Sequence, residues 1–217
     1  MSWTVIRTRF MWSRPTCSEA CMELSRCWSH ERGESVIFEK GLGELYAEAR
    51  ETVLATRVGL VSDKADNSLR LIRKQVLTGL AGREWEVGTR IFPPSAPARF
   101  QRGHYHLDAA KRAGNGGALG IVCHFGSSEF LVRQLMLISE AVRRRIVDCA
   151  VLALITSDGK PYVTGRPACY EQAQRLLRSY GQSGFPGIPI VLWGLTPDDT
   201  PRKPAHPETD FQVAGRR

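Results

Sequence analysis

Short apolar runs alternate with segments of helical periodicity in the second half of this 217-residue chain. Three runs rich in Val, Ile and Leu, at 117–125, 148–156 and 188–195, each have the length of a buried strand. Residues 127–145 and 169–180 carry apolar side chains at helical spacing between these runs. The order of the elements predicts an α/β (α+β) domain with a mixed, buried central sheet flanked by helices.

The first half of the chain predicts helices at 43–57 and 66–80, where apolar residues again recur on one helical face. We therefore expect a single folded domain over residues 43–198. Residues 1–42 form an N-terminal segment without an assignment, and the Pro-rich, charged residues 199–217 are expected to be an irregular tail.

Composition and charge bear on the partners. A net charge of +8 with 42% hydrophobic residues suits a soluble protein and favours a polyanionic partner, most commonly nucleic acid. No apolar run reaches the roughly 18 residues of a membrane span. The arginine-containing N-terminus is unlike a secretion signal, so we expect a cytoplasmic protein with free thiols.

Cys17, Cys21, Cys27 and His30 have side chains that suit zinc. Their spacing matches no common zinc finger, in which two CxxC-type knuckles face each other. The alternative is an amphipathic helix over these residues that happens to contain cysteines. The sequence leaves both interpretations open.

His104, His106 and Asp108 fall on one face if their segment is extended. Two imidazoles and a carboxylate can bind a divalent cation, and His124 on a following strand could approach them. The HxHxD pattern is similar to the start of the metallo-β-lactamase signature, but Ala109 stands where that signature has another histidine. An unrelated metal-dependent hydrolase is therefore one candidate function.

Asp108 is followed by a basic segment and then by the strand that ends at His124. Metal-dependent nucleases commonly pair one acidic residue with an acid-x-lysine motif on the next strand, where the metal activates a water. The second motif here reads Val122-Cys123-His124 and supplies no carboxylate. The Gly-rich residues 114–117 between them predict a hairpin turn, because they precede a strand instead of opening a helix.

The C-terminal half resembles the BglII/BstYI-type restriction endonucleases, which have the PD-(D/E)xK nuclease fold. The resemblance covers roughly residues 43–198. It lies in VCHFG (122–126), in YEQAQ (170–174) and in the proline-initiated strand PIVLWGL (189–195). In this family the catalytic strand reads approximately E-V-Q-F-G/S. The implied fold is a mixed sheet flanked by helices, and the implied activity is site-specific cleavage of double-stranded DNA with Mg²⁺.

The resemblance gives Asp108 the role of the first metal-binding aspartate. Val122 falls on the position of the metal-binding glutamate, and His124 falls on that of the glutamine. Three accounts of the lost glutamate stay open. A carboxylate has relocated to Glu129 or Glu140, or His106 and His124 complete a site for a softer metal such as Mn²⁺. Alternatively, the protein is a catalytically impaired relative that still binds DNA.

The resemblance also implies where DNA is bound. Base-reading residues are expected in the turn after the catalytic strand and in the loop before the Tyr-Glu helix, at Ser127, Ser128, Thr164, Gly165 and Arg166. Plausible phosphate contacts are Lys111, Arg112 and Arg133. Members of the family act as homodimers on palindromic DNA. The leading expectation is therefore a homodimeric type II endonuclease, ahead of a non-cleaving DNA-binding protein and the unrelated hydrolase.

Overall fold

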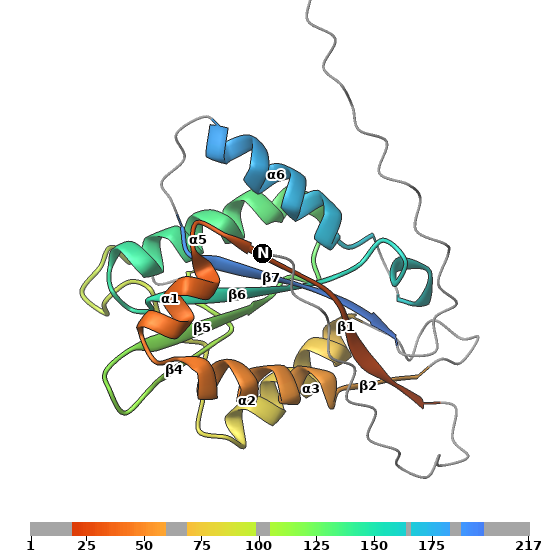
Figure 1. Ribbon diagram of the computed structural model, residues 1–217, viewed down its shortest axis with the longest axis horizontal. Helices are drawn as coiled ribbons and strands as arrows, with labels where there is room; N and C mark the ends of the chain where they lie inside the picture. The colour runs from red at the N-terminus through yellow and green to blue at the C-terminus, as the bar shows by residue number, and fades with distance from the viewer. Residues whose placement is uncertain (1–18, 60–68, 99–104, 164–165, 183–187, 198–217) are drawn as a thin grey trace, which may run out of the picture.

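The computed structural model describes residues 19–59, 69–98, 105–163, 166–182 and 188–197. A seven-stranded sheet in the order β2-β1-β7-β6-β5-β4-β3 forms the centre of the molecule (Figure 1). The strands are β1 (Glu19–His30), β2 (Arg57–Gly59), β3 (Glu86–Val87), β4 (Ala109–Arg112), β5 (Ala118–Cys123), β6 (Cys149–Ile155) and β7 (Ile190–Pro197).

The sheet is mixed, as the sequence predicts. Strands β5, β6 and β7 run parallel to one another, and the strands on either side of them pair antiparallel. Every residue of β5 and β6 is buried, which explains their continuous apolar sequences. The predicted hairpin is confirmed, because β4 and β5 pair through a turn in which Gly116 adopts a positive φ of 89°.

Helices cover both faces of the sheet (Figure 1). They are α1 (Gly33–Glu39), α2 (Gly43–Leu54), α3 (Leu69–Ala81), α5 (Leu131–Arg143) and α6 (Tyr170–Gln182), with short 3-10 helices η1 (Ser128–Phe130) and η2 (Lys160–Tyr162). Helix α5 begins at Leu131, after η1. Ser127 precedes η1, and its side chain makes no capping hydrogen bond.

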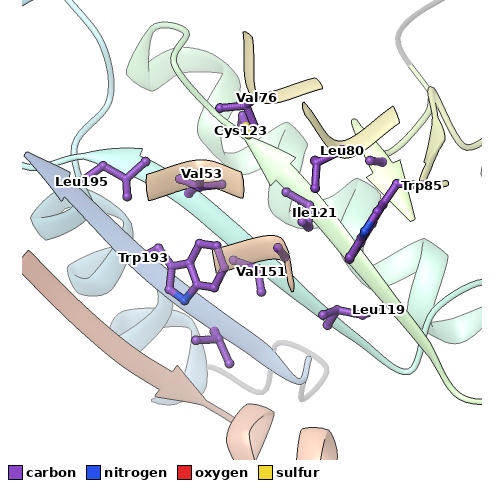
Figure 2. Close-up of a cluster of buried hydrophobic side chains, with 14 of the residues drawn as sticks. Val53, Val76, Leu80, Trp85, Leu119, Ile121, Cys123, Val151, Trp193 and Leu195 are labelled. Carbon is purple, nitrogen blue, oxygen red and sulfur yellow. The ribbon is translucent and has the colours of Figure 1, made fainter. Parts of the chain in front are cut away.

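Alternate residues of the central strands enter two separate apolar clusters. Leu119, Ile121 and Cys123 of β5 pack toward α1, α2 and α3, together with the fully buried Trp193 of β7. Figure 2 shows this cluster, in which side chains from the strands face helix residues such as Val53. The other cluster lies between the sheet and helices α5 and α6. Burial of both faces leaves the strand ends as the places for polar groups.

Strand β1 was not expected from the sequence. It pairs with β7 from Met22 to His30, so the sheet begins upstream of residue 43. The amphipathic helix proposed for these residues is therefore wrong. The segment escapes the strand pattern because its alternation is interrupted by a register shift between Leu24 and Arg26.

The cysteines and histidine of this segment do not gather into a metal site in the part of the chain that is described. Cys27 lies 3.6 Å from the Tyr46 hydroxyl of α2. The His30 ring instead lies beside Trp28. Trp28 packs against the apolar cluster between the sheet and helices α5 and α6, on the other side of the sheet. Cys17 lies outside the described residues. None of the described helices combines the length and the apolar character needed to cross a membrane.

The close approach of α1 to the sheet generates a test of the fold. A Cβ at Gly33 would lie 2.6 Å from the backbone oxygen of Ile190, whereas a Cβ at Gly43 would meet nothing within 4 Å. We expect Gly33→Ala to lower the free energy of unfolding by about 1–3 kcal/mol. Gly43→Ala should leave it unchanged or raise it by up to about 1 kcal/mol. Urea denaturation of both variants measures the difference, and equal stabilities would contradict the packing of α1.

Candidate functional site

A cavity of about 610 Å³ opens at the end of the β4–β5 hairpin. Asp108 lies directly before β4, and His124 lies directly after β5, so the hairpin brings both to the same end of the sheet. Helices α3 and α5, the 3-10 helix η1, His106 and the turn after β5 supply the rest of the lining. The lining residues are Leu69, Arg70, Arg73, His106, Asp108, Cys123, His124, Phe125, Gly126, Phe130, Arg133 and Gln134.

Asp108 is the buried polar group at the centre of this end of the hairpin. Its side chain is 8% exposed. Oδ2 accepts a hydrogen bond from the backbone N–H of Cys123 at 2.7 Å. The carboxylate therefore satisfies a donor at the end of β5, where β4 no longer offers a backbone carbonyl.

Arg73 of α3 forms an ion pair with Asp108. Its Nη2 donates to Oδ1 and its Nε donates to Oδ2, the latter at 3.4 Å. Helix α3 buries Ile72, Val76 and Leu80 against the core, which leaves the adjacent Arg73 at the margin of the buried face. The hydrogen bonds to Asp108 raise the pKa of the Arg73 guanidinium above its usual value, so this side chain stays charged.

Burial favours the neutral state of His124. The side chain is only 4% exposed, and this burial lowers the pKa of the imidazole, although the Ser127 carbonyl and Asp108 act in the opposite direction. Nε2 lies 3.1 Å from the Ser127 carbonyl oxygen, which can only accept. The proton therefore resides on Nε2 in the neutral ring.

The donor atoms of this cavity do not fit a Mg²⁺ site. Among the described residues no group of three or more His, Cys, Asp or Glu side chains is arranged to hold a metal. Asp108 is the one carboxylate in the cavity lining, and the guanidinium of Arg73 already occupies it. Mg²⁺ prefers oxygen ligands, which His106 and His124 do not supply. His104 lies outside the described residues.

Neither of the two glutamates considered as replacements for the missing carboxylate lines the cavity. Glu129 is exposed in η1 and does not line the cavity. Glu140 lies seven residues beyond Arg133 on α5, about 10 Å along the helix axis. It bonds Arg143 at 2.7 and 2.8 Å and also pairs with Arg144, and the bond from Arg143 lowers the pKa of Glu140 to about 2.

Val122 is packed where the resemblance requires a glutamate. It is 2% exposed and belongs to the apolar cluster beneath α5 and α6. An ionised side chain at this position would be desolvated without a partner among those apolar neighbours. Position 122 is therefore part of the hydrophobic core in this chain.

Two of the predicted phosphate contacts make contacts within the protein. Lys111 donates to Glu48 of α2 at 3.0 Å and to the Arg83 carbonyl, on the face of the sheet that α2 and α3 cover. Arg112 donates to the Gly116 carbonyl of the hairpin turn at 3.2 Å. Arg133 does line the cavity, and its guanidinium lies 5.4 Å from the centre of the Tyr105 ring.

The two segments expected to read bases lie side by side. Ser127 forms an isolated β-bridge with Pro167, and the N–H of Ala168 donates to the Gly126 carbonyl at 2.8 Å. Ser128 and Arg166 are exposed next to this junction. Thr164 and Gly165 lie outside the described residues. The turn after β5 and residues 166–168 before α6 therefore meet at one junction, and Gly126 of this junction also lines the cavity.

Sequence reasoning missed Arg70 and Arg73 as components of this cavity. They precede Asp108 by more than 30 residues, and nothing in the local pattern links α3 to the hairpin. The available signal was two arginines at i and i+3 beside an apolar helical face, which places both on one side of the helix.

Solved structures that are similar to this chain include two of one restriction endonuclease. The restriction endonuclease BglII complexed with a DNA 16-mer aligns with a TM-score of 0.58 and 15% sequence identity, over 80% of this chain and 76% of that chain. Free BglII aligns with a TM-score of 0.52 and 16% identity, over 80% of this chain and 79% of that one. No protein-family model and no curated protein matches the sequence.

These comparisons confirm the predicted fold class. The chain has a restriction-endonuclease-like α/β fold, with a mixed central sheet and helices on both faces. The low sequence identity establishes the fold alone, so membership in the BglII/BstYI-type family stays a prediction.

The environment of Asp108 predicts a stability difference. Asp108→Ala leaves the Cys123 N–H without its acceptor and Arg73 without its partner, so we expect the free energy of unfolding to fall by about 1–3 kcal/mol. Glu140→Ala removes surface ion pairs with Arg143 and Arg144 and should cost at most about 1 kcal/mol. Chemical denaturation compares the two, and a loss in Asp108→Ala no greater than in Glu140→Ala would contradict the structural role of Asp108.

The lowered pKa of His124 predicts a pH dependence. The unfolded chain binds a proton near pH 6.5 and the folded chain only at lower pH, so stability is lost as pH falls through this window. We expect His124→Gln to make the decline of the unfolding free energy between about pH 7.5 and about pH 5.5 shallower. His30→Gln is the matched comparison. Burial lowers the pKa of His30 too, so this variant measures the contribution of the second buried histidine to the same slope. An unchanged slope in His124→Gln would refute the assignment.

Proposed function

We propose that this protein binds double-stranded DNA through the face that carries the cavity, and that it does so without metal-assisted cleavage. The observation that carries the proposal is the gathering of Arg70, Arg73 and Arg133 around one cavity at the open end of the hairpin. Guanidinium groups match the geometry of phosphate oxygens and stay charged at all physiological pH values.

Charge and fold support this proposal. The net charge of +8 favours association with a polyanion. The similar BglII structure is a complex with DNA, which supports the same class of ligand for this fold. The outcome that sequence reasoning ranked second, a non-cleaving DNA-binding protein, is thus the one that the donor atoms of the site favour.

The half-buried Ser127 and the exposed Ser128 and Arg166, at the junction beside the cavity, form the proposed base-reading surface. Ser127 and Ser128 offer hydroxyls that suit any base, and Arg166 suits the O6 and N7 atoms of guanine. Gly126 of this junction lines the same cavity as Arg133, so one segment of DNA would contact the junction and the cavity together. A homodimer on a two-fold symmetric DNA site follows from the family resemblance and is part of the same proposal. The proposed location is the cytoplasm, because the N-terminus is unlike a secretion signal.

A metal-dependent endonuclease is the second candidate. The observation in its favour is that Asp108, His106 and His124 line the same cavity, at the end of the hairpin where the resemblance puts the metal. Against it stand the single carboxylate and the apolar packing of Val122. The two candidates differ in one measurable respect, which is hydrolysis of the DNA.

We expect purified protein to bind a labelled random-sequence duplex in fluorescence anisotropy, with affinity falling as salt is raised. Arg133→Met should weaken binding about five-fold at 0.15 M salt and reduce the salt slope by about one, because one phosphate contact is lost. Arg143→Met removes the same charge from the exposed end of α5 and is the control that should leave the slope unchanged.

Plasmid DNA incubated with Mg²⁺ or Mn²⁺ distinguishes the two candidates. We expect no nicking or linearisation by the wild type. Cleavage by the wild type that is lost in Asp108→Ala would establish the endonuclease instead. Failure of the wild type to bind any duplex at about 0.05 M salt would exclude both candidates, since phosphate contacts are strongest at low salt.

A further inference from the structure

Both oxygens of the Asp108 carboxylate accept hydrogen bonds from the protein itself, from three N–H groups of two residues. Cys123 N–H and Arg73 Nε both reach Oδ2, and Arg73 Nη2 reaches Oδ1. In a metal-dependent nuclease of this fold, the resemblance puts a divalent cation on this carboxylate. Here a positive charge from the chain already lies against it, and a second cation at the same place would be repelled.

Arg73 keeps donors for a ligand after it has bound Asp108. A guanidinium has five N–H donors, and the two contacts with Asp108 use two of them. In the described part of the chain Arg73 has no further hydrogen-bonding partner, and 44% of its side chain is exposed. It lines the cavity together with Arg70 and Arg133.

The ion pair also fixes the direction of the guanidinium. Asp108 is held by the backbone of β5, and Arg73 is held through the buried residues of α3. Two contacts between the planar guanidinium and the planar carboxylate leave the guanidinium little freedom to rotate. The exposed edge of Arg73 is therefore pre-oriented for a ligand in the cavity, which lowers the entropy lost on binding.

We infer that Arg73 takes the place of the divalent cation in this site, binding Asp108 on one side and a DNA phosphate on the other. The inference rests on the proposed function, because it assigns the phosphate contact of the same DNA-binding cavity. Its consequence is that DNA binding at this cavity requires no divalent metal.

The first test measures duplex affinity of the full chain in Mg²⁺ and in EDTA at matched ionic strength. We expect wild-type affinities within about two-fold of each other. Arg73→Met should weaken binding about five-fold in both buffers and lower the salt slope by about one, whereas Arg143→Met should leave the slope unchanged. Arg73→Lys should bind more tightly than Arg73→Met and less tightly than the wild type, because lysine keeps the positive charge but lacks the planar guanidinium donors.

The second test measures Mn²⁺ binding by electron paramagnetic resonance, without DNA. We expect no saturable Mn²⁺ site in the wild type. A saturable site that Asp108→Asn abolishes would overturn the inference, as would a ten-fold or greater gain of DNA affinity with Mg²⁺. Equal salt slopes in Arg73→Met and Arg143→Met would also overturn it.

The failure of each proposal is distinguishable. If no duplex is bound in either buffer, the proposed DNA-binding function is wrong. If duplex is bound but requires Mg²⁺, or is unaffected at Arg73, only the role of Arg73 is wrong. Should circular dichroism show that Arg73→Met is unfolded, Arg73→Lys together with the wild-type Mn²⁺ measurement decides, since neither depends on that variant.

Discussion

Burial of both faces of the central sheet is the constraint on which the rest of this structure depends. Strands β5 and β6 have no exposed residue, because helices α1 to α3 cover one face and helices α5 and α6 cover the other. In these two strands charged groups can then lie only beyond the ends, where backbone donors lack partners and solvent is near. Asp108 and His124 occupy such an end. The packing of the core therefore determines where in the molecule the cavity lies.

The same constraint explains what the sequence could predict. Fully buried strands give continuous apolar runs, and β5, β6 and β7 were recognised for that reason, as were the helices between them. Strand β1 lies at a less buried part of the sheet and carries a register shift, so its residues gave no clear period. Strand β4 has only four residues, two of them basic, and its sequence resembles a turn.

The site was predictable in part. The end of the hairpin could be located from the order of Asp108, the glycine turn and the strand that ends at His124, all close in sequence. Its electrostatic state could not, because Arg73 is contributed by α3, 35 residues before Asp108. Ion pairs between distant segments depend on how elements pack, and single-sequence periodicity carries no such information. The environment of Val122 is likewise a property of the packed core.

The hydrogen bond from Ala168 to Gly126 has a consequence for how the proposed DNA-binding surface can change over evolutionary time. The two segments that it joins come from separate crossovers of the sheet, yet they share one backbone contact. An insertion or deletion in either segment would displace the other. We therefore expect relatives of this chain to vary the side chains at this junction while they retain the lengths of both segments, so that divergence proceeds by substitution.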